Sequence, residues 1–83
     1  MNKREELKAM CGAVDELAAK MKKKLRAKAR EGYSGGLKDV YRRSVSSKLH
    51  QHSWRLTEEF EGAKQAVDVC NLAMMLWVLG GKP

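Results

Sequence analysis

The chain has 83 residues, of which 43% are hydrophobic and 33% are charged, a balance typical of one small folded domain and not of a disordered chain. One proline and 6% aromatic residues argue against a small β-barrel and favour helices. The sequence shows no apolar signal region, and its one apolar run is shorter than the ~20 residues that a membrane span needs. We therefore expect no membrane association and a location in the cytoplasm, where two isolated cysteines stay reduced.

The net charge of +7 is concentrated in one segment of the chain. Residues 20–30 hold seven cations and no acid, whereas the other 72 residues hold ten cations and ten acids. This segment predicts a site for an anionic ligand, which is a nucleotide, a nucleic acid or an acidic protein surface. The alternative is a solvated helix end, where cations also favour the helix dipole. The cations are Lys20, Lys22, Lys23, Lys24, Arg26, Lys28 and Arg30.

Residues 3–30 predict one long helix. Asn2 is placed to cap it, and Glu5 completes a box-like start three residues later. Apolar residues recur seven apart and form a heptad seam. The helix would be about 40 Å long, too long for the rest of the chain to cover, so we expect an intermolecular contact along it. The seam columns are Leu7, Val14 and Met21; Met10 and Leu17; and Cys11, Ala18 and Leu25.

Three glycines within residues 32–36 predict the end of the first helix and a loop. The loop is either a plain connector or a backbone that contacts phosphate, although it lacks the spacing of a P-loop. A second helix is expected at about 37–56 and a third at about 58–79, with Thr57 as a candidate cap. The chain is thus predicted to be a single all-α domain, 1–83, with a long N-terminal helix and two further helices packed as a helical-bundle oligomer.

The third predicted helix carries an apolar run over residues 66–79, which only Asp68 and Asn71 interrupt. A carboxylate in such a helix is costly unless it is paired, protonated or bound to a metal. Asp68 is therefore functional, or a partner in a buried polar contact, or at the edge of the buried surface. An apolar helix without a polar face is expected to be covered on all sides, and a second copy would provide cover. The expected oligomer interface consists of Leu7, Val14, Met21, Met74, Met75 and Trp77.

Glu58, Glu61 and Asp68 are the best candidates for metal ligands. With Gln65 they are spaced 3, 4 and 3 residues apart, which on one helix is a single stripe. Carboxylates at this spacing suit Mg²⁺, a hard cation that prefers oxygen ligands. The alternative is a solvated acidic face that pairs with lysines or arginines of a neighbouring helix.

Residues 67–76 read Val-Asp-Val-Cys-Asn-Leu-Ala-Met-Met-Leu, which resembles the Asp-Val-Ala-Asn-x-Ala-Met-Met-Leu stretch of phage proteins related to the MazG-like nucleotide pyrophosphohydrolases. The segment 21–33 resembles a second piece of the same pattern. The resemblance implies an all-helical dimer or tetramer that uses Mg²⁺ to cleave nucleoside triphosphates to monophosphate and pyrophosphate. It also implies a host-cell cytoplasmic location for a phage-encoded protein.

The resemblance further implies metal ligands from a Glu-x-x-Glu motif and from a Glu-x-x-Asp motif on a facing helix. Asp68 matches the last aspartate and Glu58-x-x-Glu61 has the form of the first motif, but Gln65 stands where the second motif has glutamate. If the second helix is instead the facing one, residues 51–55 with His52 occupy the equivalent stretch and hold no carboxylate.

Three functional hypotheses follow. The chain is a minimal MazG-like enzyme with Mg²⁺ on Glu58, Glu61 and Asp68. Alternatively it is a non-enzymatic protein on the same scaffold, which sequesters a nucleotide or inhibits a host defence factor. The third hypothesis is a helical module that binds nucleic acid through residues 20–30. No catalytic residue is assigned.

Overall fold

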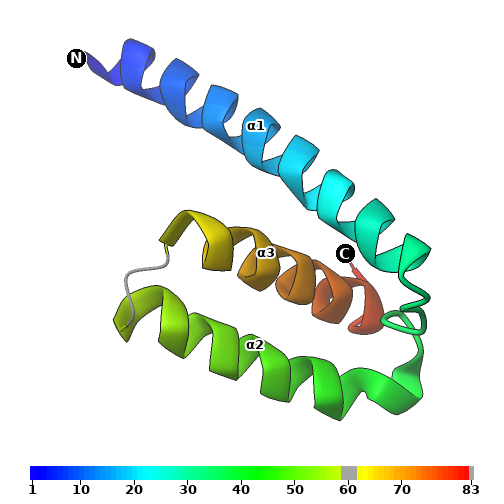
Figure 1. Cartoon of the computed structure of the whole chain (residues 1–83). Helices are drawn as coiled ribbons and strands as arrows, with labels where there is room; N and C mark the ends of the chain where they lie inside the picture. Colours follow the sequence, from blue (N-terminus) through cyan, green and yellow to red (C-terminus); the bar gives the residue numbers. More distant parts are fainter. Residues whose placement is uncertain (59–61, 83) are drawn as a thin grey trace.

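Over residues 1–58 and 62–82, the computed structural model consists of three α-helices and one short 3₁₀ turn (Figure 1). The helices are α1 (Lys3–Arg30), α2 (Arg42–Glu58) and α3 (Gly62–Leu79), and the turn is η1 (Asp39–Tyr41). The structure describes residues 1–58 and 62–82. Within these ranges no strand is present, so the predicted all-α class is confirmed.

The N-terminus of α1 is capped through the side chain of Asn2. Its Oδ1 accepts a hydrogen bond from the backbone N–H of Glu5 at 2.9 Å, and its Nδ2 donates to Oε1 of Glu5 at 2.9 Å. These two bonds satisfy one of the backbone N–H groups that a helix start leaves without a partner and orient the capping side chain. The helix therefore begins at the residue that the sequence predicted.

Glycines in the left-handed region end both α1 and α3. Gly32 has φ +93°, and the N–H of Tyr33 reaches back to the carbonyl of Lys28 at 3.1 Å. Gly81 has φ +93° at the end of α3, with the same six-residue closure beside it. Both ends are Schellman motifs, which need a residue that adopts positive φ at no cost.

α2 begins later and ends later than the spacing of apolar residues predicts. The expected helix was 37–56, but its first five residues, 37–41, form a turn and η1 instead, and α2 begins at Arg42. Leu37 and Val40 are both exposed. Since these two apolar side chains stay exposed, their burial does not stabilise a helix over these residues. Thr57 is not a cap for α3, because it lies inside α2 and its hydroxyl donates to the carbonyl of Trp54 at 3.1 Å.

α3 lies between the other two helices (Figure 1). It pairs with α2 as an antiparallel hairpin, and α1 crosses its opposite side. The hydrophobic core is thin, since Val45 and Val67 are the only buried hydrophobic residues among those described. The loop after α1 also closes on α3, because a Cβ on Gly36 would lie 3.0 Å from Sδ of Met75. A side chain at this position would require the end of the Met75 side chain to shift by a few tenths of an ångström.

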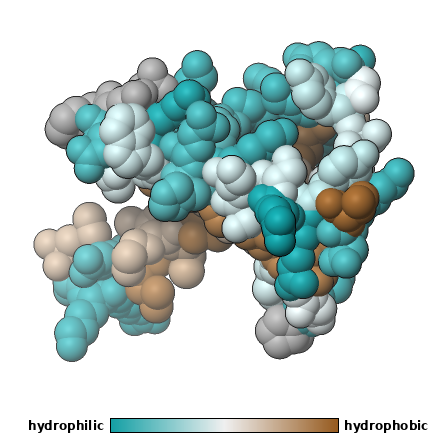
Figure 2. Space-filling model, turned by 90° about the horizontal axis from the view of Figure 1, so that it is seen from below, coloured by the Kyte–Doolittle hydropathy of each residue, from teal (hydrophilic) through white to brown (hydrophobic). Residues whose placement is uncertain are grey.

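The N-terminal half of α1, residues 3–16, extends beyond the α2–α3 hairpin (Figure 1). Its seam residues Leu7, Met10 and Val14 are 59%, 54% and 63% exposed. Figure 2 shows this half as a projecting arm that carries hydrophobic residues. Further along the seam, Met21 is half-buried, so one continuous apolar seam is covered at one end only.

The predicted interface residues fall into two groups. Leu7, Val14 and Trp77 are exposed, which is what an interface with another molecule requires, whereas the predicted methionines are half-buried within the chain. These methionines are Met21, Met74 and Met75.

Candidate functional site

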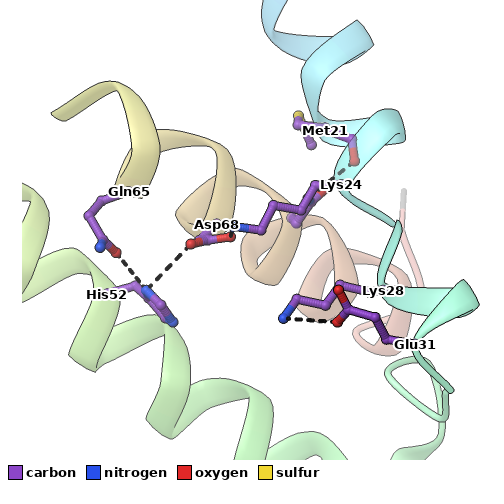
Figure 3. Close-up of polar contacts among 8 residues, drawn as sticks. Met21, Lys24, Lys28, Glu31, His52, Gln65 and Asp68 are labelled. Carbon is purple, nitrogen blue, oxygen red and sulfur yellow. Dashed lines mark hydrogen bonds and ion pairs between the residues drawn. The ribbon is translucent and has the colours of Figure 1, made fainter. Parts of the chain in front are cut away.

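Asp68 lies in the groove where α3 passes between α1 and α2 (Figure 3). Its Oδ1 is 2.8 Å from Nζ of Lys24 on α1, and its Oδ2 is 3.9 Å from Nδ1 of His52 on α2. Its side chain is 17% exposed. Asp68 therefore pairs α3 with α1 and lies beside His52 of α2, which is the polar-contact alternative among the three that the sequence left open.

His52 makes a second link from α2 to α3. Its Nδ1 lies 2.6 Å from Oε1 of Gln65, and Gln65 is 3% exposed. Since an amide oxygen only accepts hydrogen bonds, Nδ1 of His52 carries the hydrogen. Gln65 thus fixes the position of the imidazole beside Asp68.

Asn71 extends this polar stripe along α3 by three residues. Its Nδ2 donates to the backbone carbonyl of Met21 on α1 at 3.3 Å, and it is 5% exposed. Its Oδ1 has no hydrogen-bond partner within residues 1–58 and 62–82. The stripe therefore links α3 to α2 through Gln65 and to α1 through Asp68 and Asn71.

The predicted carboxylate stripe on one helix is wrong. Glu58 is the last residue of α2, whereas Gln65 and Asp68 lie on α3, because the chain reverses direction between the two helices. Glu61 lies outside the described residues. In the described part of the chain, no three His, Cys, Asp or Glu residues are close enough to hold a metal ion.

The donor set around Asp68 does not fit Mg²⁺. A hard divalent cation needs several oxygen ligands, and the carboxylate instead contacts an ammonium group and an imidazole. The Mg²⁺ site on Glu58, Glu61 and Asp68 stays a prediction because one of its members is not described.

A hollow of about 400 Å³ lies between α1 and α3, beside the Lys24–Asp68 ion pair. Five of its eight lining residues are lysines, and one is a carboxylate. Four of the lysines belong to the predicted cationic segment, and Lys64 comes from the start of α3. We call this site the lysine hollow. Its lining residues are Lys20, Lys23, Lys24, Ala27, Lys28, Glu31, Lys64 and Val67.

The lysines of the hollow differ in their partners. Lys24 is paired with Asp68, and Lys28 has Glu31 at 3.8 Å and the ring of Tyr33 at 4.8 Å. The other three make no ion pair with any residue that the structure describes. Lysines without an ion-pair partner that line one concave surface make it positively charged and attract anions. These three are Lys20, Lys23 and Lys64.

The remaining cations of the segment lie outside the hollow. Lys22, Arg26 and Arg30 follow one another at a spacing of four on α1, so they form a second stripe on its surface. All three are exposed. The segment 20–30 thus divides into a stripe that faces the hollow and a stripe that faces solvent.

Reasoning from the sequence did not identify Lys64, and it did not pair His52 with Gln65 or Asp68. Lys64 is four residues from Asp68 but lies apart from the cationic segment, so no local pattern marks it. His52 was recognised only as part of the stretch that faces the third helix if the second helix is its partner. Because α2 ends at Glu58 and α3 begins at Gly62, His52 and Asp68 each lie six residues from these ends, and an antiparallel pairing of the two helices brings them together.

No family model, curated protein or solved structure matches this chain. The resemblance to the MazG-like group therefore stays a prediction. No helix within the described residues is long and apolar enough to cross a lipid bilayer.

Proposed function

We propose that the protein binds a nucleotide-sized phosphate compound in the lysine hollow and does not hydrolyse it. The observation that carries the proposal is that five lysines and one carboxylate are among the eight residues that line a hollow of about 400 Å³. This volume lies within the range of small-molecule sites, roughly 300–1,000 Å³. Lysine ammonium groups are common ligands of phosphate oxygens.

The nucleotide part of the proposal rests on the sequence resemblance, and the lack of hydrolysis rests on Asp68. In the MazG-like pattern Asp68 matches a Mg²⁺ ligand, but here its carboxylate is 2.8 Å from the ammonium group of Lys24. Water activation by Mg²⁺ requires open carboxylate ligands. This pairing supports binding without turnover.

Calorimetry with ATP, inorganic triphosphate and sodium sulfate tests the proposal. The variant Lys20→Gln/Lys23→Gln/Lys64→Gln removes the three unpaired charges of the hollow. The control Lys22→Gln/Arg26→Gln/Arg30→Gln removes the same number of charges from the solvent-facing stripe. We expect the hollow variant to bind triphosphate at least about tenfold more weakly, because several charge-assisted hydrogen bonds to phosphate are removed, and the control to bind within about threefold of the original chain.

Two results would contradict this proposal. Equal losses of affinity in both variants mean that the net charge, and not the hollow, attracts the ligand. Release of pyrophosphate from ATP in the presence of Mg²⁺ means that the chain is an enzyme.

Nucleic-acid binding is a second candidate function, and the solvent-facing stripe favours it. Three exposed cations at a spacing of four on a straight helix can follow a line of phosphates on a nucleic-acid backbone. The same two variants distinguish the candidates when a 20-base-pair DNA duplex replaces ATP. Nucleic-acid binding predicts that the control variant binds the duplex more weakly and that the slope of its salt dependence becomes shallower by about one for each phosphate that is no longer neutralised.

A further inference from the structure

We propose that residues 3–16 of α1 form an antiparallel pair with the same residues of a second copy of this chain, so that the protein is a two-fold symmetric dimer. The paired surface is defined by Leu7, Met10 and Val14, and the two-fold axis passes between Met10 and Cys11. This inference is independent of the lysine hollow and of any ligand.

The first argument is the mismatch in length between α1 and its intramolecular partner. α1 has 28 residues and α3 has 18, so α1 is about 15 Å longer at 1.5 Å per residue. The seam residues beyond α3 are exposed, whereas Met21 on the same seam is half-buried. The apolar repeat continues over residues 7–14, although nothing in the part of the chain that the structure describes covers it there.

The second argument is the amount of surface that the single chain exposes. It exposes 6798 Å², whereas a compact monomer of this mass, 9.4 kDa, exposes about 5,000 Å². The excess of about 1,800 Å² is larger than the ~800 Å² that each partner contributes to a standard interface. The radius of gyration of 14.4 Å also exceeds the ~12 Å of a compact domain of this length.

The third argument is charge, which selects both the partner and its direction. Residues 3–16 hold three cations and four acids, so two copies of this segment do not repel each other. Residues 17–30 hold seven cations and no acid. A parallel pair would place two such segments side by side, whereas an antiparallel pair about residues 10–11 sends them to opposite ends. The same charge pattern argues against a lipid surface as the occupant, since the cations lie on the half whose apolar seam is already covered.

The antiparallel register makes a specific prediction about neighbours. Leu7 of one copy lies against Val14 of the other, because the two positions are equally far from the axis. Such an isologous contact closes on itself and leaves no free seam, so assembly ends at the dimer. Heptad packing of this kind uses the same knobs-into-holes contacts as a coiled coil.

Sedimentation equilibrium tests the dimer. We expect a species of twice the chain mass, and we expect Leu7→Glu/Val14→Glu to weaken its dimerisation at least about 100-fold, or tenfold for each substituted position. The matched control Ala9→Glu/Ala19→Glu adds the same charges on the opposite face of α1 and should leave the dimer intact. Because Leu7 and Val14 are exposed in the single chain, the seam variant should keep the helical circular dichroism spectrum of the original chain.

Disulfide trapping tests the direction. In a Cys11→Ala/Cys70→Ala background, proteins carrying Leu7→Cys or Val14→Cys are mixed and oxidised with copper-phenanthroline. The antiparallel pair predicts a mixed disulfide between positions 7 and 14, with few disulfides between identical positions. A chain that stays monomeric up to about 1 mM overturns the proposal. So do a dimer that Leu7→Glu/Val14→Glu does not weaken, disulfides only between identical positions, or a monomer that binds phosphatidylserine vesicles through the seam.

Discussion

The arm formed by residues 3–16 of α1 and the body formed by residues 17–58 and 62–82 use the same heptad seam in two different ways. In the body the seam packs on α3, and the polar stripe of α3 adds the ion pair of Asp68 with Lys24 and one hydrogen bond from Asn71 to the carbonyl of Met21 on α1. In the arm the seam is exposed and the charge is nearly balanced. The comparison shows that an apolar repeat in the sequence marks a surface that needs cover, while the length of the neighbouring helix decides whether the cover comes from the same chain.

The largest difference between arm and body should follow from the same substitution made in each. Val45 on α2 is 5% exposed, whereas Val14 is 63% exposed. Val45→Asp buries a carboxylate without a partner and should lower the free energy of unfolding by about 3 kcal/mol or more. Val14→Asp should lower it by less than about 0.5 kcal/mol. Urea denaturation at a chain concentration below that of dimerisation measures both.

A loss of stability of equal size in both variants would mean that the arm folds as part of the core. A dilution series separates this outcome from dimerisation, because only an effect on the dimer depends on chain concentration.

A smaller effect on stability is expected when Asp68, whose carboxylate pairs with Lys24, is substituted. Asp68→Ala removes the half-buried partner of Lys24 and His52 and should cost about 1–2 kcal/mol of unfolding free energy. Asp15→Ala, an exposed aspartate of the arm, is the matched control and should change it by less than about 0.5 kcal/mol. A double-mutant cycle with Lys24→Met measures the coupling between the ion-pair partners, and a coupling near zero would show that the ion pair does not stabilise the body.

The end of α1 offers a third test of the body. Gly32 closes the helix with φ +93°, so Gly32→Ala should destabilise the body by about 1 kcal/mol because a Cβ is strained in this region. Gly32→Asn is the matched variant, since asparagine tolerates positive φ better, and it should recover part of the loss. Thermal unfolding of the three chains measures the series, and identical melting temperatures would show that this helix end is not coupled to the rest of the fold.

The elements with strong local signals were predictable from the sequence. The start of α1 follows from Asn2 and Glu5, and its end follows from Gly32, because capping chemistry is local. The beginning of α2 was not predictable, since Leu37 and Val40 keep a helical spacing but have no buried face in the structure. Spacing alone does not state whether a partner surface exists.

The candidate site was predicted in part. The cations of segment 20–30 were found, and Asp68 was recognised as a polar interruption that needs a partner. Its actual partners depend on how three helices cross, which is a tertiary property. Lys24 is 44 residues away from Asp68 in the chain and His52 is 16 residues away. Contacts across such distances leave no local pattern unless the hairpin register is known.

The smallest effect is expected in the arm itself, where it separates local from global folding. Gly12 lies inside α1, and a Cβ added to it meets nothing within 4 Å. Gly12→Ala should therefore stabilise the local helix by about 0.5–1 kcal/mol, which slows amide hydrogen exchange of residues 7–14 by roughly two- to fivefold. If the arm opens before the body unfolds, exchange in α3 and the urea midpoint should stay unchanged in the monomer. If α3 exchanges more slowly as well, arm and body form one cooperative unit, and the comparison between them describes packing but not stability.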